Sequence, residues 1–149
     1  MGYELVDVST PEDWAAYHDI RRRELFEARG RFGIYNPNYP DEHTPDKHHY
    51  LLKHDGKPVG TTRLDVRGDG SAVFRLVAIT ATEQGKGHGR VLSELVEGRA
   101  RGFGAHTLLV NAARTALGYY EKTGWQVHEW DASELVDMAA ECVQMRKLL

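Results

Sequence analysis

The chain has 149 residues, 41% of them hydrophobic, and a formal net charge of −3 at pH 7. This length and apolar content suit one compact domain over residues 1–149, and the slight acidic excess argues against a broadly basic nucleic-acid surface. The single cysteine, Cys142, excludes an intramolecular disulfide and a metal–thiolate cluster.

No targeting or membrane segment is predicted. The N-terminus lacks the apolar core of a signal peptide, and no apolar stretch reaches membrane-spanning length. We therefore expect a cytoplasmic protein without membrane contact.

The first elements are a strand and a helix. Residues 3–8 have strand character, and Thr10-Pro11-Glu12-Asp13 forms a capping box with proline at the first helical position. A helix should follow, with Gly30 as its stop. Residues 31–47 contain three prolines and show no hydrophobic period, so we expect an irregular loop there.

The next elements predict an antiparallel meander. Segments 48–53 and 57–66 flank Asp55-Gly56, a hairpin signal, and Gly68-Asp69-Gly70 turns the chain into a third strand over 71–80. Beyond residue 90 the patterns predict alternating helices and strands. These are a helix ending near Gly104, a strand at 106–110, a helix at about 113–123, and strands near 125–130 and 141–148. The order is typical of an α+β fold around a mixed sheet.

Residues 77–90 pass from a β-branched run into a glycine-rich turn and then into a helical pattern from Val91. The alternating glycines leave several backbone N–H groups open where a helix dipole begins. Added positive charge favours an anion at the same place. The turn is therefore predicted to bind a phosphate or pyrophosphate. Its glycines are Gly85, Gly87 and Gly89, and its basic or titratable residues are Lys86, His88 and Arg90.

The spacing excludes two common phosphate loops. A Walker A loop needs Ser or Thr directly after Gly-Lys, but Gly87 follows Lys86. A dinucleotide fingerprint needs G-x-G-x-x-G, and the last position falls on Arg90 or Leu92. The pattern that fits is Gln84-x-x-Gly87-x-Gly89. It resembles the acyl-coenzyme A pyrophosphate loop, Q/R-x-x-G-x-G/A, of the GCN5-related N-acetyltransferase (GNAT) family.

A second match to the same family follows downstream. A short buried strand over 106–110 leads into Asn111, and residues 111–125 resemble the family's strand, Asn, helix and Tyr-Glu-Lys-x-Gly-Phe segment. Together the two matches cover roughly residues 73–130, and the flanking elements extend the likeness over the chain. The resemblance implies the acyl-CoA N-acyltransferase (GNAT) fold. In that fold the central strands, here 71–80 and 106–110, splay apart at their C-terminal ends within a mixed sheet flanked by helices.

The resemblance also implies roles for individual residues. Backbone groups at Leu76, Val77 and Ile79 would contact the pantetheine arm of acetyl-CoA, and a backbone N–H there would meet the oxyanion. Asn111 would contact the cofactor arm or an ordered water. Tyr120 would act as general acid toward the thiolate, since a phenol with a pKa of about 10 is protonated at neutral pH. The pyrophosphate would lie against Gln84, Gly85, Lys86, Gly87, His88, Gly89 and Arg90.

Each assignment has a plainer alternative. The glycine-rich turn could be merely flexible, and Gln84 could be an ordinary polar residue at a helix start. Tyr119 and Tyr120 could both be packing aromatics, and we keep Tyr119 in that role. His43, His48, His49 and His54 could suggest a metal. However, His48 and His49 should point to opposite faces of a strand, and acyl transfer needs no metal.

The general base is the main departure from the family. Many members carry a glutamate on the central strand, whereas residues 74–77 read Phe-Arg-Leu-Val and the next carboxylate is Glu83. His48, His49 or His128 could act through water. Alternatively, no base is needed if the amine loses its proton to solvent before binding.

The acceptor is the second open question. In this fold the loop after the first helix walls the acceptor site. Here it contains acidic and aromatic residues that favour a cationic amine, unless it is simply a solvated loop. We therefore expect acetyl transfer from acetyl-CoA to a primary amine of a small molecule, by direct attack in a ternary complex. A protein N-terminus or lysine, or a non-catalytic CoA-binding module, are the alternatives, and a homodimer is compatible with each. The loop residues concerned are Tyr35, Tyr39, Asp41, Glu42 and Asp46.

Overall fold

The computed structural model describes residues 2–38 and 40–149, without the side chains of residues 40 and 41. Within this part, seven strands form one mixed sheet in the order β1-β2-β3-β4-β5-β7-β6. All neighbouring strands are antiparallel except β4 and β5. The strands are β1 (Tyr3–Asp7), β2 (Lys47–His54), β3 (Lys57–Val66), β4 (Ser71–Ile79), β5 (Thr107–Ala112), β6 (Gln126–Val127) and β7 (Val143–Leu148), and the α-helices are α1 (Pro11–Arg21), α2 (His88–Gly102) and α3 (Leu117–Lys122).

The predicted hairpin between β2 and β3 is confirmed. Asp55 and Gly56 both have positive φ, +52° and +80°, which is the backbone of a type I′ turn. This turn matches the right-handed twist of the strands that it joins. The meander β2-β3-β4 is therefore antiparallel, as the sequence predicts.

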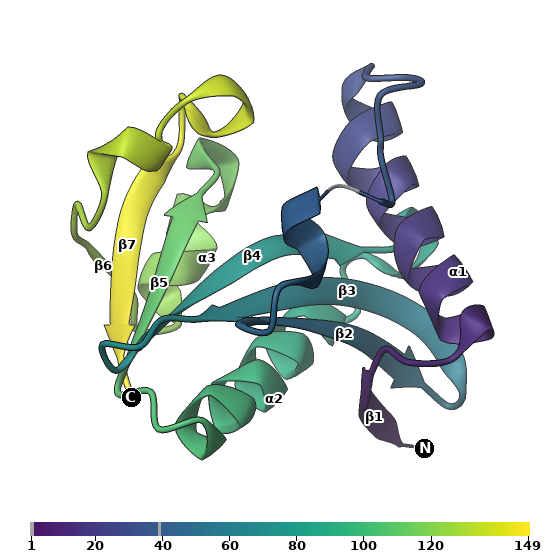
Figure 1. Cartoon of the computed structure of the whole chain (residues 1–149), viewed down its shortest axis with the longest axis horizontal. Helices are drawn as coiled ribbons and strands as arrows, with labels where there is room; N and C mark the ends of the chain where they lie inside the picture. Colours follow the sequence, from purple (N-terminus) through teal and green to yellow (C-terminus); the bar gives the residue numbers. More distant parts are fainter. Residues whose placement is uncertain (1, 39) are drawn as a thin grey trace.

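The helical segment that starts with α1 begins and ends at the predicted signals. The Thr10 hydroxyl accepts a hydrogen bond from the Asp13 amide at 3.1 Å, and Pro11 is the first helical residue. The helix continues as a π-helical turn, Arg22–Phe26, and a 3-10 turn, Glu27–Arg29. It then stops at Gly30, whose φ of +76° is left-handed. Figure 1 shows this extension rising beyond the edge of the sheet.

Two apolar clusters lie on opposite faces of the sheet. Alternation along β2 sends Leu52 to the cluster covered by α2 and α3, and Leu51 to the cluster covered by α1. In the first, α2 contributes Leu92 and Val96, both almost fully buried. Helices α1 and α2 therefore cover opposite faces of the sheet (Figure 1).

The C-terminal third differs from the expectation in its bounds. The predicted strand 125–130 is limited to β6. Beyond β6, two backbone amides bond to the side chain of Gln144 instead of to a neighbouring strand. Gln144 Oε1 accepts from the amides of Trp130 and Asp131, both at 2.9 Å. The predicted helix 113–123 begins with a 3-10 turn, Arg114–Ala116, and becomes α-helical only at Leu117.

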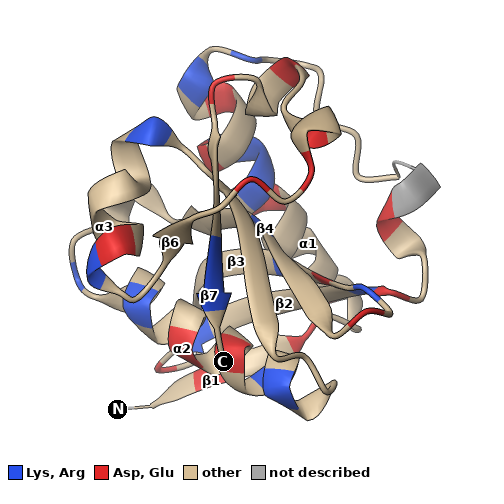
Figure 2. Ribbon diagram, turned by 90° about the vertical axis from the view of Figure 1, so that its left-hand side faces the viewer, with Lys and Arg blue, Asp and Glu red and all other residues tan. Residues whose placement is uncertain are grey.

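Charged side chains of both signs are distributed over the molecule (Figure 2). In the view of Figure 2, Lys and Arg are interspersed with Asp and Glu rather than gathered on one broad face. No helix in the described ranges is long and apolar enough to cross a bilayer.

Candidate active site

The two central strands separate at their C-terminal ends, as predicted. Parallel pairing of β4 with β5 runs from Ser71–Thr107 to Phe74–Val110 and then ceases. Strand β4 nevertheless continues to Ile79. Backbone groups beyond the last pair have lost their partner across the gap, so they can meet another molecule there.

A bulge in β4 accompanies the separation. Thr61 of β3 pairs with Ala78, but Arg63 pairs with Arg75, so β4 carries one extra residue between these pairs. Leu76 lies in this interval with φ of +54°, a left-handed conformation that costs a non-glycine residue about 1–3 kcal/mol. A bulge bends its strand and leaves the extra residue out of the ladder. Backbone strain is thus concentrated where β4 leaves β5.

A cavity of about 470 Å³ lies in this gap. It extends from the start of α2 to the extension of α1 and to the connection between β6 and β7. Its lining is largely apolar, with a few hydroxyl, amide, thiol and guanidinium groups. The lining residues are Leu25, Arg29, Phe74, Arg75, Leu76, Val77, Gly89, Ser93, Val110, Asn111, Ala113, Thr115, Ala116, Tyr119, Tyr120, Met138, Ala139 and Cys142.

Tyr120 is the buried phenol of the cavity. Burial, followed by the neighbouring Tyr119 and Cys142, raises its pKa to about 12, so it carries its proton at neutral pH. Its hydroxyl makes no hydrogen bond within residues 2–38 and 40–149, whereas Tyr119 OH lies 3.3 Å from Ser93 Oγ. Both tyrosines line the cavity, and only Tyr120 is buried.

Asn111, at the end of β5, is held by two side chains. Its Nδ2 donates to Glu134 at 3.1 Å, and its Oδ1 accepts from Gln144 Nε2 at 3.0 Å. The amide is therefore oriented before any ligand arrives.

The start of α2 has the geometry of an anion site. Gly87 caps the helix with φ of +86°, and Gly85 has φ of +80°, conformations that favour glycine. Val91 donates to the Gly87 carbonyl at 3.3 Å, the first bond of the helical ladder. The amides of residues 88–90 precede this bond and have no acceptor within the helix. A Cβ at Gly89 would meet only Ile79 Cγ1, at an ordinary contact distance of 3.8 Å, and Gly89 lines the cavity.

The basic side chains of this turn are already engaged. Glu83 lies 3.0 Å from His88 Nε2, 3.1 Å from Lys86 Nζ and 3.6 Å from Lys57 Nζ. Hydrogen bonds from His88 and Lys86 lower the pKa of Glu83 to about 2. His88 is buried and also lies 2.7 Å from Tyr3 OH. Its imidazole is thus directed to Tyr3 and Glu83.

The remaining side chains of the turn lie apart from the cavity. Gln84 Nε2 donates to the Ile79 carbonyl at 3.0 Å, and the exposed Arg90 lies 3.3 Å from Glu94. Of the predicted cofactor positions, four line the cavity: Leu76, Val77, Gly89 and Asn111. Those outside its lining are Ile79, Gln84, Gly85, Lys86, Gly87, His88 and Arg90. The predicted general acid, Tyr120, also lines the cavity.

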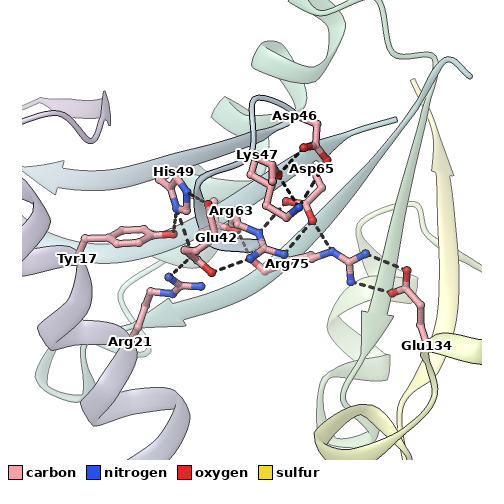
Figure 3. A network of polar contacts seen from close by, with 12 residues as sticks. Tyr17, Arg21, Glu42, Asp46, Lys47, His49, Arg63, Asp65, Arg75 and Glu134 are labelled. Carbon is pink, nitrogen blue, oxygen red and sulfur yellow. Dashed lines mark hydrogen bonds and ion pairs between the residues drawn. The ribbon is translucent and has the colours of Figure 1, made fainter. Parts of the chain in front are cut away.

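Sequence reasoning missed a buried ionic network beside the cavity (Figure 3). Arg75 donates to both oxygens of Glu134 at 2.8 and 2.9 Å and to Asp65 at 2.8 Å. Arg63 joins Asp65 to Glu42, which Arg21 contacts at 2.6 Å. The only sequence signal was an arginine at position 75 of the central strand, because its partners are distant along the chain.

The expected acidic wall is not built by Glu42 or Asp46. Burial acts to raise the pKa of Glu42, but Arg21 and Arg63 hold it below its usual range. Asp46 accepts from Thr44 Oγ1 at 2.6 Å. Neither residue lines the cavity, nor does Tyr35. Tyr39 lies outside the described residues, and the Asp41 side chain is not described.

The predicted histidine bases also lie away from the cavity. His48 stacks on Phe103 with ring centroids 4.2 Å apart, and His49 lies 2.8 Å from Tyr17 OH. His128 is exposed beside β6. Among the residues that the structure describes, no group of three or more His, Cys, Asp or Glu could hold a metal.

Comparisons with known proteins agree on one family. The model of the acetyltransferase (GNAT) domain matches residues 35–149. The chain is 25% identical over 137 residues to the uncharacterized N-acetyltransferase YjcF of Bacillus subtilis, with 89% of this chain and 96% of the relative covered.

Two solved structures show the same fold. A Lactobacillus plantarum protein assigned to the N-acetyltransferases aligns with a TM-score of 0.81 and 24% identity, over 100% of this chain and 99% of that one. The PaiA N-acetyltransferase of Thermoplasma acidophilum, solved with coenzyme A, aligns with a TM-score of 0.74 and 16% identity over all of both chains.

Proposed function

The chain belongs to the acetyltransferase (GNAT) family and is an acyl-CoA-dependent N-acetyltransferase; on this premise we propose that it acetylates a primary amine of a small molecule, with acetyl-CoA as donor. One observation carries the proposal. A single cavity touches the open start of α2 at Gly89, the splayed strands at Val77 and Asn111, and the phenol of Tyr120.

The cofactor fits this cavity in one direction. The pyrophosphate lies on the amides of residues 88–90, where a helix start favours negative charge. The pantetheine arm runs along β4 at Leu76 and Val77, whose backbone lies beyond the last pair with β5. The thioester then reaches Tyr120 deeper in the gap. The phosphates are contacted by the backbone of the turn. Its side chains have a supporting role through the contacts described above; they are Gln84, Lys86, His88 and Arg90.

Acyl transfer then proceeds by direct attack. The amine nitrogen bonds to the thioester carbon, backbone N–H groups at the Leu76 bulge stabilise the oxyanion, and the carbon–sulfur bond breaks. Tyr120 gives its proton to the departing thiolate and regains one from solvent or from the product nitrogen. Burial raises the pKa of the Cys142 thiol, which disfavours the thiolate that a covalent route would need.

The amine binds in its neutral form. Among the described residues, the cavity lining contains no carboxylate and no histidine that could accept a proton from the amine. Desolvation in the largely apolar cavity lowers the pKa of an amine, so it favours the species that attacks. Proton loss to solvent before binding therefore replaces a general base.

The size of the cavity favours a small acceptor. A volume of about 470 Å³ is within the usual range for small-molecule sites, and the cofactor arm fills part of it. The extension of α1 and the β6–β7 connection also contribute to its lining, through Leu25 and Arg29 and through Met138, Ala139 and Cys142.

The test is thiol release from acetyl-CoA with a panel of small primary amines, run beside peptides with a free N-terminus or lysine. We expect thiol release and an acetylated amine, seen as a 42 Da gain in mass, with at least one small amine and not with the peptides. Turnover of peptides alone would indicate a protein acceptor. Coenzyme A binding without turnover of any amine would indicate a non-catalytic module.

A further inference from the structure

We propose that the acceptor amine carries a carboxylate or similar anionic group, and that Arg29 binds this group at the rim of the cavity. The inference rests on the proposed function, because it names the class of amine that the same cavity accepts. It starts from the charges around the cavity, which are balanced everywhere except at Arg29 and its neighbour Arg114.

The buried ionic network leaves no charge for a ligand. Its three guanidiniums face three carboxylates, and every guanidinium contacts at least one of them. Arg75, the one member that lines the cavity, donates through Nε to Asp65 and through both terminal nitrogens to Glu134. Its charge is therefore already compensated. The members are Arg21, Arg63, Arg75, Glu42, Asp65 and Glu134.

Arg29, in contrast to the arginines of the network, has no carboxylate partner among the described residues. Its side chain is exposed, lines the cavity, and makes no hydrogen bond or ion pair with the described part of the chain. Its backbone is fixed, because it is the last residue of the 3-10 turn that ends at Gly30. The Gly30 amide donates to the Glu27 carbonyl at 3.0 Å, and the Arg31 amide donates to the Phe26 carbonyl at 2.9 Å. A free guanidinium thus stands on an anchored turn.

A second unpaired cation lies on the same side. Burial raises the pKa of Cys142, and both Arg29 and Arg114 act against this shift, so both guanidiniums lie near the thiol. Arg114 also makes no hydrogen bond or ion pair within residues 2–38 and 40–149, and it stands between the lining residues Ala113 and Thr115. Two uncompensated positive charges thus border the Cys142 end of the cavity.

The position of Arg29 assigns it to the acceptor rather than to coenzyme A. Helices α1 and α2 cover opposite faces of the sheet. The cofactor phosphates are expected at the start of α2, whereas Arg29 belongs to the turn that extends α1 and lines the cavity from there. The surface near it is apolar, with Leu25, Met138 and Ala139 in the lining.

These features describe a class of acceptor. An apolar body would pack on the lining, and a planar carboxylate would pair with the fork of a guanidinium, which binds carboxylates through two parallel hydrogen bonds. The acceptor is therefore an amino acid or a related amine with an apolar body and one negative charge, instead of the cationic amine that the loop composition predicts.

Matched amines test this inference. The rate of acetyl transfer is measured for phenylalanine against 2-phenylethylamine and for leucine against 3-methylbutylamine, with kcat/KM expressed per neutral amine. The proteins are the natural chain, Arg29→Gln and Arg31→Gln. Arg31 is also an exposed arginine but lies outside the lining, so it is the matched control. In parallel, calorimetry measures binding of 3-phenylpropanoate to each protein saturated with coenzyme A, which needs no turnover.

We expect the natural chain and Arg31→Gln to favour the carboxylate member of each pair by about tenfold, the order of a charge-assisted hydrogen bond, and to bind 3-phenylpropanoate. Arg29→Gln should lose both properties while the Kd for coenzyme A stays unchanged. Equal use of both members by the natural chain would overturn the inference and leave the proposed function intact. A raised Kd for coenzyme A in Arg29→Gln, with unchanged selectivity, would place Arg29 at the cofactor and also overturn it. Binding of 3-phenylpropanoate through Arg29 without turnover of any small amine would uphold the anion site and refute the proposed function. If the natural chain neither bound 3-phenylpropanoate nor acetylated any small amine, both the inference and the proposed function would be refuted.

Discussion

Arg75 and Glu134 form a double ion pair, with N–O distances of 2.8 and 2.9 Å, across the open end of the gap between β4 and β5. Glu134 also accepts a hydrogen bond from Asn111 at the end of β5. One carboxylate from the β6–β7 connection therefore contacts both strands beyond the point where they cease to pair. The carboxylate of Glu134, which is distant from both strands in the sequence, thus holds the side chains of Arg75 and Asn111 at the mouth of the cavity.

Removing this carboxylate charge should destabilise the fold. Glu134→Gln keeps the shape of the side chain but leaves Arg75 with Asp65 as its only anionic partner. Because both side chains of the pair are about one-quarter exposed, we expect a loss of about 1–2 kcal/mol in the free energy of unfolding, measured with urea. Asp7→Asn, which removes an exposed partner of Arg99, is the control and should change it by about 0.5 kcal/mol or less. Equal effects in both variants would show that Glu134 contributes no more than a surface charge.

Tyr120→Phe should impair catalysis without impairing cofactor binding. The change removes one hydroxyl and keeps the ring against Trp125, whose centroid lies 5.4 Å away. We expect kcat to fall by about tenfold to a hundredfold, the lower part of the range for lost general acid catalysis, because a thiolate leaves readily near neutral pH. Tyr119→Phe is the matched control and loses only the weak contact with Ser93. Full activity of Tyr120→Phe would remove the phenol from the mechanism.

The stability of the protein should fall in mild acid through His18. Burial, followed by Arg21, lowers the pKa of His18 from 6.5 to about 4. Below pH 6.5 the unfolded chain therefore takes up a proton that the folded chain does not take up until about pH 4. Stability is present above pH 6.5 and is lost as the pH falls through this window, by about 1 kcal/mol after allowance for solvent screening.

The measurement is the free energy of unfolding between pH 7 and pH 4 in the natural chain and in His18→Gln. The variant should lose part of the pH dependence, even though it is less stable at pH 7 because the stack on Trp14 is gone. An unchanged slope would show that another group causes the loss. His49 would then be the first residue to examine, because burial lowers its pKa as well.

Local signals in the sequence were sufficient for most of the secondary-structure elements. Thr10-Pro11, Asp55-Gly56 and the glycines of the turn at 85–89 act through their own backbone, so their structural consequences can be predicted from short windows. The family resemblance added the splay and the assignments of Tyr120 and Asn111, and the splay is confirmed.

Long-range pairing explains what was missed. Glu134 pairs with Arg75 across 59 residues of sequence. The side chain of Gln144 accepts hydrogen bonds from the amides of residues 130 and 131, where the sequence predicts the end of a strand. Glu42 was predicted as an acceptor ligand because its loop is acidic. The structure buries it between arginines from α1 and β3. No short window of sequence contains both members of such a pair, so the composition of the loop could not show that Glu42 is already neutralised.

The placement of acetyl-CoA is tested most directly by a calorimetric titration of coenzyme A into the natural chain, Gly89→Leu and Gly98→Leu. Both glycines lie in α2, and neither has a close neighbour: a Cβ at Gly98 would meet no atom within 4 Å, and one at Gly89 would meet only Ile79 Cγ1 at 3.8 Å. Only Gly89 adjoins the free amides and the cavity. Either change should stabilise the helix by up to about 1 kcal/mol, so lost binding cannot be ascribed to unfolding. We expect Gly98→Leu to bind like the natural chain, and Gly89→Leu to bind at least about tenfold more weakly because its side chain covers the amides. Unchanged affinity in Gly89→Leu, or no binding by the natural chain, would contradict a cofactor held at the start of α2.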